Sequence, residues 1–230
     1  MSIGNLKIVG TPIGNLGDIS LRALESLKEA DYILCEDTRV TKKLLDHYQI
    51  DTNTLSYHQH SGRLKVDKII SLLKEGKNLA LVSDAGTPGV SDPGGKLIEE
   101  VKKEFEDSIK IESVPGPSAL TTAISISGLK MDRFIFLGFL PHKKGRQTMI
   151  KEIIGNKYPT ALYESKHRIV KLMNELIDTG EELDIFIARE LTKLHESVYQ
   201  GSPRDVLSKL EEKESNLKGE FVVLINKKGA

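Results

Sequence analysis

Short apolar runs alternate with amphipathic segments along the first half of the chain. Leu21, Leu24 and Leu27 recur at helical spacing after Ser20, whose hydroxyl suits a helix N-cap. The apolar runs predict strands at residues 6–9, 32–35, near 55, at 79–82 and at 109–111. The segments between them predict helices that start after Ser20 and that cover about 41–47, 64–75 and 93–105. This alternation indicates a mostly parallel sheet with helices on both faces.

A second α/β series follows a proline-rich segment. Residues 114–119 read VPGPSA, and two prolines around a glycine cannot continue a helix or a strand. Beyond it the pattern predicts helices at about 118–126, 146–154, 167–177 and 203–212, and strands at 134–137, 160–163, 184–188 and 221–225. We therefore expect an α/β protein of two lobes, residues 1–114 and 115–230, with a ligand cleft between them.

A stretch rich in glycine and proline follows the fourth predicted strand. Residues 83–94 read SDAGTPGVSDPG, and Asp92 and Pro93 suit the N-cap and first turn of the next helix. Loops beyond the carboxyl ends of parallel strands are where α/β folds bind ligands. The sequence therefore indicates a binding loop here. A tight surface turn is the alternative that the residues alone leave open.

Two further loops are expected at the same edge of this sheet. Residues 10–14 (GTPIG) follow the first strand, and residues 36–39 (EDTR) follow the second. The spacing of Gly10 and Gly14, and the missing N–H of Pro12, exclude the dinucleotide-binding fingerprint, and the chain contains no P-loop. Residues 36–39 contain two carboxylates and a guanidinium. These side chains can belong to a functional site, or the segment can be a solvated turn that caps the next helix.

Charge and composition narrow the class of protein. The 33 Lys and Arg residues balance the 33 Asp and Glu residues, which excludes a globally basic nucleic-acid binder but allows local basic patches. The single cysteine, Cys35, lies in an apolar run and suits a buried residue in a reducing compartment. We find no signal peptide and no membrane span, so we expect a cytoplasmic protein. His58 and His60 lack the Cys or carboxylate neighbours of a metal site, so we expect no metal.

Clusters of basic residues follow several strands of the second lobe. The loop at 140–146 (LPHKKGR) contains three lysine or arginine residues. Lys166 follows the strand at 160–163, and Arg189 follows the strand at 184–188. Such cations can contact RNA phosphates. Each cluster can also be a solvated loop or an ion-paired helix start, and no aromatic ladder for base stacking accompanies them.

Five segments, in their order and spacing, carry a resemblance to a known family. They are residues 9–16, 36–39, 83–94, 114–119 and 188–193. The chain resembles the tetrapyrrole methylase family from about residue 5 to 226, which implies a two-lobed, homodimeric, cytoplasmic class III methyltransferase. Gly86-Thr87-Pro88 stands where many tetrapyrrole-modifying members carry Gly-Asp-Pro, and this departure points toward the RNA-modifying branch. That branch implies methyl transfer from S-adenosylmethionine to the ribose 2′-oxygen of a cytidine in 16S ribosomal RNA of the small subunit.

The resemblance also implies the residues that bind the methyl donor between the lobes. The matching positions are Pro12, Asp84, Ala85, Gly86, Thr87, Val90, Ser118, Ala119, Tyr163 and Ala188. Methyl transfer is an in-line displacement, so the donor and the acceptor oxygen must be aligned, but no metal is needed. A further group must accept the hydroxyl proton or lower the pKa of the hydroxyl. Their positions at strand ends make Lys166, Arg39 and Glu36 our candidates for that group. Our candidates for RNA contact are Lys143, Lys144, Arg146 and Arg189.

Two other functions stay open from the sequence. The same fold could methylate a tetrapyrrole or another small molecule. Alternatively, the chain could be a non-catalytic ribosome-assembly factor that binds RNA without a methyl donor, which calorimetry with S-adenosylmethionine would reveal. Because a formally neutral chain would gain basic clusters by pairing with a second copy, we also expect a homodimer.

Overall fold

The computed structural model describes residues 3–58, 61–92 and 94–228 of the chain. It divides into two compact units, Met1–Ser118 and Ala119–Ala230, whereas the sequence placed the boundary after residue 114. No helix in the described part of the chain is both long and apolar enough to cross a lipid bilayer.

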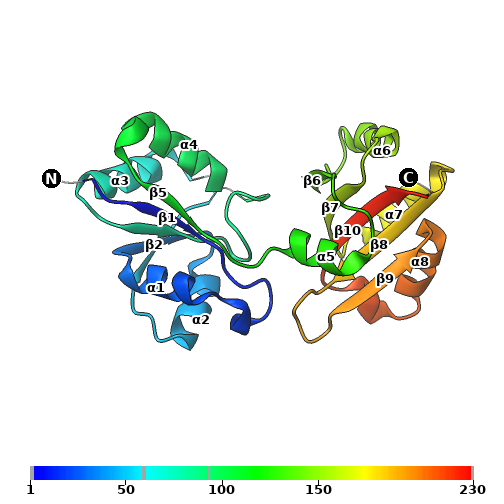
Figure 1. The fold of residues 1–230 in the computed structure, drawn as a ribbon, viewed down its shortest axis with the longest axis horizontal. Coiled ribbons are helices and arrows are strands. Elements are labelled where there is room, and N and C mark those ends of the chain that lie inside the picture. Colours follow the sequence, from blue (N-terminus) through cyan, green and yellow to red (C-terminus); the bar gives the residue numbers. More distant parts are fainter. Residues whose placement is uncertain (1–2, 59–60, 93, 229–230) are drawn as a thin grey trace. The chain divides into compact units, whose positions relative to one another are not determined.

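The first unit is built on a five-stranded parallel sheet in the order β3-β2-β4-β1-β5. Helices α1 and α2 cover one face of this sheet, and α3 and α4 cover the other (Figure 1). The strands are β1 (Leu6–Val9), β2 (Tyr32–Cys35), β3 (Asn53–Ser56), β4 (Leu79–Leu81) and β5 (Ile111–Val114). The helices are α1 (Leu21–Glu29), α2 (Thr38–His47), α3 (Arg63–Lys74) and α4 (Gly94–Phe105), with the short 3-10 turns η1 (Leu16–Asp18) and η2 (Glu106–Ser108).

The central strands of this sheet are apolar on both faces because helices cover both. On β2, Leu34 packs into the core under α3 and α4, while Ile33 and Cys35 pack into the core under α1 and α2. The parallel sheet predicted for residues 1–113 is confirmed.

Two boundaries differ from the prediction. Helix α2 begins at Thr38, three residues before the predicted start, because the Asp37 side chain accepts a hydrogen bond from the Arg39 N–H and caps it. Strand β5 covers Ile111–Val114 and not 109–111, because the η2 turn uses the preceding residues and the pairing with β1 runs to Val114.

The second unit is built on a mixed five-stranded sheet in the order β6-β7-β10-β8-β9. Strands β6 and β7 are parallel, and all other neighbours are antiparallel. The strands are β6 (Ile135–Phe139), β7 (Thr160–Ser165), β8 (Leu183–Arg189), β9 (Ser197–Gly201) and β10 (Glu220–Lys227). The helices are α5 (Ala119–Ser127), α6 (Arg146–Gly155), α7 (Ile169–Asp178) and α8 (Pro203–Glu211), with the 3-10 turn η3 (Glu214–Leu217).

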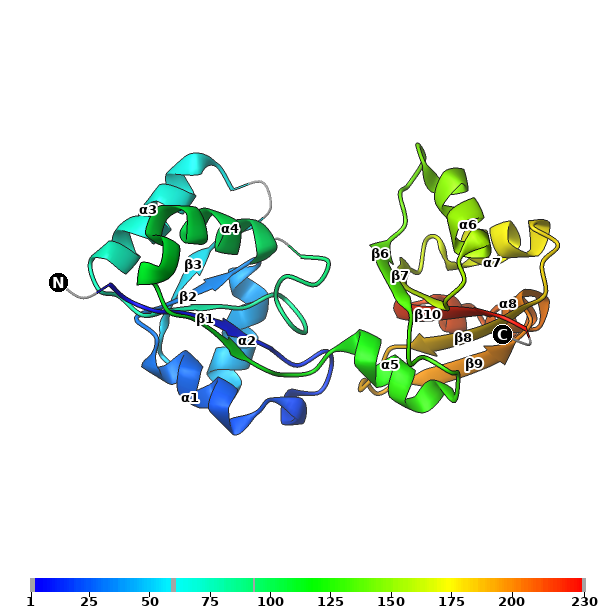
Figure 2. The same cartoon turned by 45° about the horizontal axis from the view of Figure 1, so that its top comes forward.

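The core of the second unit lies between its sheet and α6, α7 and α8. Alternate residues of β10, such as Phe221 and Val223, face this core. Helix α5 contacts β10 and β8. It lies on the opposite face of the sheet from α6 and α7 (Figure 2). Strand β9 was not predicted, since its residues Ser197–Gly201 form a half-exposed edge strand without a continuous apolar run.

Candidate functional site

The loops after β1 and β4 are joined by backbone hydrogen bonds at the carboxyl edge of the first sheet. The Thr11 N–H donates to the Gly86 carbonyl at 2.9 Å, and the Gly86 N–H donates to the Thr11 carbonyl at 3.1 Å. The buried Thr11 hydroxyl adds a hydrogen bond to the Ser83 carbonyl at 3.2 Å. The predicted convergence of residues 10–14 and 83–94 is confirmed, and Thr11 is the residue that the sequence analysis missed.

The segment after β5 reaches the same edge through a close approach of two glycines. A Cβ atom on Gly10 would lie 2.7 Å from the Gly116 backbone nitrogen, and one on Gly116 would lie 2.7 Å from the Gly10 carbonyl oxygen. The Thr87 hydroxyl donates to the Pro117 carbonyl at 3.4 Å. Gly116 between two prolines was the signal in the sequence, because only glycine allows this contact.

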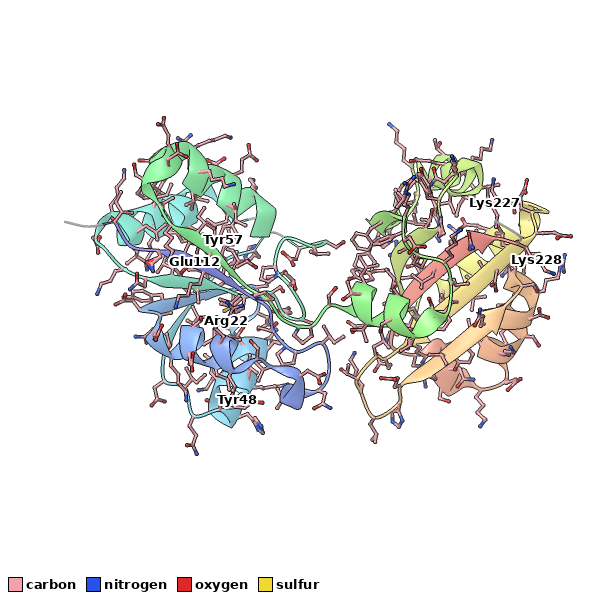
Figure 3. The ribbon with its side chains drawn as sticks, in the orientation of Figure 1. Arg22, Tyr48, Tyr57, Glu112, Lys227 and Lys228 are labelled. Carbon is pink, nitrogen blue, oxygen red and sulfur yellow. The ribbon has the colours of Figure 1, made fainter. Side chains whose placement is uncertain are left out.

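A further contact fixes the far end of the loop after β1. The Tyr48 hydroxyl, just beyond α2, donates to the Leu16 carbonyl in η1 at 2.7 Å (Figure 3). The loop is therefore held by the loop after β4 near its start and by Tyr48 near its end.

The loop after β4 turns back on itself through the Asp92 carboxylate. Its Oδ1 atom accepts hydrogen bonds from the Gly89 N–H at 2.6 Å and from the Gly94 N–H at 2.9 Å. Gly86 and Gly89 adopt positive φ angles of 81° and 90°. Asp92 thus closes the turn ahead of α4, and Pro93, expected in the first turn, lies outside the described residues.

The loop after β2 places Glu36 next to two other carboxylates. The Asp37 N–H donates to Asp84 Oδ1 at 3.0 Å, which holds the Asp84 carboxylate beside the backbone that follows Glu36. Burial raises the pKa of the Glu36 carboxyl, and the negative charges of Asp84 and Asp92 raise it further. A carboxylate with a raised pKa is a better proton acceptor near neutral pH.

Arg39 lies on the surface and pairs with its neighbour. Its Nε and Nη2 atoms donate to the two carboxylate oxygens of Asp37 at 3.0 and 2.6 Å, while the Arg39 side chain stays 87% exposed. These hydrogen bonds hold the pKa of Asp37 at about 2 and raise the pKa of Arg39. Arg39 therefore cannot accept a proton, and its available role is electrostatic.

The expected donor-binding residues of the first unit lie together on these loops. The Thr11–Gly86 contacts bring Pro12 next to residues 84–87, where Asp84 and Ala85 are exposed and Thr87 is half-buried. Val90 is exposed farther along the same loop. Ser118 and the neighbouring Ala119, at the unit boundary, are half-buried.

The two expected donor-binding residues of the second unit share a face of its sheet. Tyr163 on β7 and Ala188 on β8 both pair with Val222 on the strand between them. The Tyr163 ring packs against Phe136 and Phe139, with ring centres 5.1 and 5.6 Å away. Tyr163 is half-buried, and Ala188 is buried.

Arg146, expected to contact RNA, is instead a buried structural residue. Only 1% of it is exposed, and its guanidinium contacts Glu175 at 2.8 Å and Glu164 at 3.4 Å. Glu164 is also buried and pairs with Arg168 at 2.8 Å. This network holds the start of α6 against β7 and α7, so we remove Arg146 from the RNA-contact candidates.

Arg189 requires the same correction. Its guanidinium donates to the carbonyls of His195, Ser215 and Lys218 at 2.9, 2.6 and 2.6 Å, and the residue is 6% exposed. It therefore holds together the segments that flank β9 and β10. In contrast, Lys143 and Lys144 are exposed before α6, and Lys166 is exposed in the turn after β7.

The described residues contain no group of three or more His, Cys, Asp or Glu side chains arranged to hold a metal ion. His58 is exposed, and His60 lies outside the described residues. Burial raises the pKa of the Cys35 thiol, with smaller contributions from the carboxylates after β2 and β4, so this thiol is a poor nucleophile.

Solved structures share this arrangement of sheets. A diphthine synthase superposes with a TM-score of 0.73 over 96% of this chain and 90% of its own, at 18% identity. A cobalt precorrin-4 methyltransferase superposes with a TM-score of 0.68 over 96% and 94%, at 19% identity. The parallel sheet, the mixed sheet and the loops at the edge of the first sheet define a class III methyltransferase fold.

The sequence comparisons identify the family. A family model described as Tetrapyrrole (Corrin/Porphyrin) Methylases matches residues 5–206, and the chain belongs to this family of methyltransferases. It is 42% identical over 226 residues to the ribosomal RNA small subunit methyltransferase I of Thermotoga maritima, covering 98% of this chain and 100% of the relative. Proteins of the same name from Hydrogenobaculum sp. (44% identity; 96% and 95% covered) and Escherichia coli O157:H7 (42%; 97% and 78%) are similar to it as well.

Proposed function

We propose that this methyltransferase transfers a methyl group from S-adenosylmethionine to the ribose 2′-oxygen of a cytidine in 16S ribosomal RNA of the small subunit. The observation that carries the proposal is 42–44% identity, over 96–98% of the chain, to relatives named ribosomal RNA small subunit methyltransferase I. Cytoplasmic location and a homodimeric state belong to the same proposal.

The loops at the edge of the first sheet fit a polar methyl donor. Asp84 offers an exposed carboxylate that can accept hydrogen bonds from hydroxyl or ammonium groups. Gly86 is buried and has a positive φ of 81°, a conformation that residues with a side chain rarely adopt, so glycine fits the turn behind the exposed Asp84 and Ala85. We propose that the donor contacts Pro12, Asp84, Ala85, Gly86, Thr87, Val90, Ser118, Ala119, Tyr163 and Ala188.

The reaction needs one proton acceptor. The ribose oxygen forms a bond to the methyl carbon as the carbon–sulfur bond breaks, and the hydroxyl proton leaves for a base. Glu36 is our first candidate for this base, because its carboxyl combines a raised pKa with a position among the joined loops. Arg39 and Lys166 remain candidates for charge stabilisation and for contact with the acceptor, and Lys143 and Lys144 for contact with RNA phosphates.

One experiment tests the proposed function directly. The protein is incubated with labelled S-adenosylmethionine and small ribosomal subunits from a strain that lacks the modification, and the label is then mapped. We expect a single 2′-O-methylated cytidine in 16S ribosomal RNA. In a parallel incubation with a tetrapyrrole in place of the subunits, label on the tetrapyrrole, with none on RNA in the first incubation, would assign the small-molecule acceptor. Subunit binding without donor binding in calorimetry would assign the assembly factor.

A further inference from the structure

A basic pocket lies at the edge of the second sheet where β7 begins and β10 ends. It has a volume of about 360 Å³, and its lining includes Lys130, Asp132, Arg133, Lys157, Tyr158 and Asn226. Three of these residues are cations, and one is a carboxylate. This volume is within the range of small-ligand sites, and the excess of positive charge favours an anion.

Tyr158 lies close to two of the cations. The Arg133 Nη1 atom donates to the Tyr158 hydroxyl at 3.3 Å, and the Arg133 guanidinium carbon lies 5.9 Å from the ring centre. The Lys157 Nζ atom lies 5.8 Å from the same ring centre. Both distances are near the outer limit of a cation–π contact, so these contacts are weak, and both cations keep their full charge for a ligand.

These cations have no carboxylate partner within the described residues. No ion pair of the described chain involves Lys130, Arg133 or Lys157, although Asp132 lies in the same pocket. Lys130, Arg133 and Lys157 are all exposed. Each can therefore pair with a phosphate without breaking an existing ion pair, unlike Arg146 in its buried network.

The pocket is separated from Lys166, the candidate residue that lies in the same unit, by the length of a strand. Strand β7 runs from Thr160 beside the pocket to Ser165, next to the exposed Lys166. Five residue steps along a strand span about 17 Å. One RNA molecule can therefore contact the residues at both ends of β7 through different nucleotides.

We propose that Lys130, Arg133 and Lys157 form a binding site for the phosphate backbone of the RNA substrate, away from the nucleotide that is methylated. The proposal deepens the proposed function and rests on it for the identity of the RNA. Contacts to phosphate contribute affinity and register, and their strength depends on salt.

The test compares three variants for binding of small ribosomal subunits at several salt concentrations. K130A/R133A/K157A removes the cations, K130R/R133K/K157R retains them, and K68A/K102A/K151A removes three exposed lysines elsewhere as a control. For the first variant we expect about tenfold weaker binding and a salt slope, log K against log salt, smaller by about 2. The KM for subunits should rise with little change in kcat, and S-adenosylmethionine should bind as to the wild type.

Binding by the charge-retaining variant should match the wild type. The inference would be overturned if K130A/R133A/K157A and the lysine control had the same affinity for subunits and the same salt slope. This holds even if the protein methylates RNA. Binding that depends on the pocket, in a wild-type protein that transfers no methyl group to RNA, would support the site and refute the proposed function.

Discussion

The Asp37 N–H donates a 3.0 Å hydrogen bond to Asp84 Oδ1 and thereby ties the loop after β2 to the loop after β4. A backbone group of the loop after β2 therefore orients a carboxylate of the loop after β4. Thr11 adds the loop after β1 to the same assembly through its contacts with Gly86. The loops of the site are therefore held together both by backbone hydrogen bonds, between Thr11 and Gly86, and by side-chain groups such as the Asp84 carboxylate.

Replacing Asp84 should weaken donor binding more than it weakens the fold. Since the side chain is exposed and holds one N–H, we expect D84A to raise the Kd for S-adenosylmethionine about tenfold, or about 1.4 kcal/mol. D84N keeps an oxygen for the Asp37 N–H and should lose less affinity. Calorimetry with D67A, an exposed substitution on α3, serves as the control. Unchanged donor affinity in D84A would remove Asp84 from the donor site.

Glu36 should set the acid limb of the pH dependence of methylation. A base must be deprotonated, so kcat should rise with pH through the raised pKa of Glu36 and then level off. In E36Q we expect kcat to fall about 100-fold or more and this limb to disappear. Single-turnover assays at several pH values measure both effects. Should E36Q keep the limb and the rate, Lys166 would become the next residue to test.

The same substitution should affect stability in the opposite direction. The folded state raises the pKa of Glu36, so this group stabilises the protein below its unfolded-state pKa, and that contribution is lost as pH rises through the folded-state pKa. E36Q should therefore have a Tm at or above that of the wild type at pH 8, with a smaller advantage at pH 4. A clear loss of Tm at pH 8 would show that the ionised carboxylate stabilises the fold, which is the opposite of the effect expected from a raised pKa.

The contact between Gly10 and Gly116 should tolerate no side chain. In G10A the new methyl group would meet the Gly116 backbone at 2.7 Å, so we expect a loss of about 1–3 kcal/mol in unfolding free energy and weaker donor binding. G155A, whose Cβ would meet nothing within 4 Å, should be neutral or slightly stabilising. Urea unfolding of both variants tests this, and equal stabilities would mean that the backbone separates at low cost.

The proposed homodimer can be tested by light scattering. The chain mass is 25.5 kDa, so a dimer should scatter as twice that mass across the concentrations used for methylation assays. Scattering at the mass of one chain would refute the dimer.

The sequence predicted the first sheet and its loops well because parallel strands buried on both faces give continuous apolar runs. Their carboxyl ends must meet at one edge, so the convergence of residues 10–14 and 83–94 followed from the topology. In the second unit the same alternation did not reveal strand direction. Apolar runs carry no information on the direction of a strand, and the half-exposed edge strand β9 has no such run.

Whether an individual lysine or arginine side chain is buried or exposed could not be predicted from its position in the sequence. Arg146 and Lys144 lie in one basic loop, yet the former is enclosed and the latter exposed. The difference depends on Glu164 and Glu175, which come from β7 and α7 and reach Arg146 only through tertiary packing. The cations of the pocket beside β7 escaped notice for the same reason, since residues 130–133 and 157 are brought together by the fold.

Arg146 offers the clearest separation between a structural and a binding role. Removing its guanidinium leaves the buried Glu164 with Arg168 as its remaining cation, and breaking a buried ion pair costs about 3–5 kcal/mol. We therefore expect R146M to lose about that much unfolding free energy in urea, whereas K144M, at an exposed position, should change by less than about 0.5 kcal/mol. At a temperature where R146M is folded, its affinity for small ribosomal subunits should match the wild type. An R146M protein of wild-type stability with weakened subunit binding would instead restore Arg146 as a contact residue for RNA.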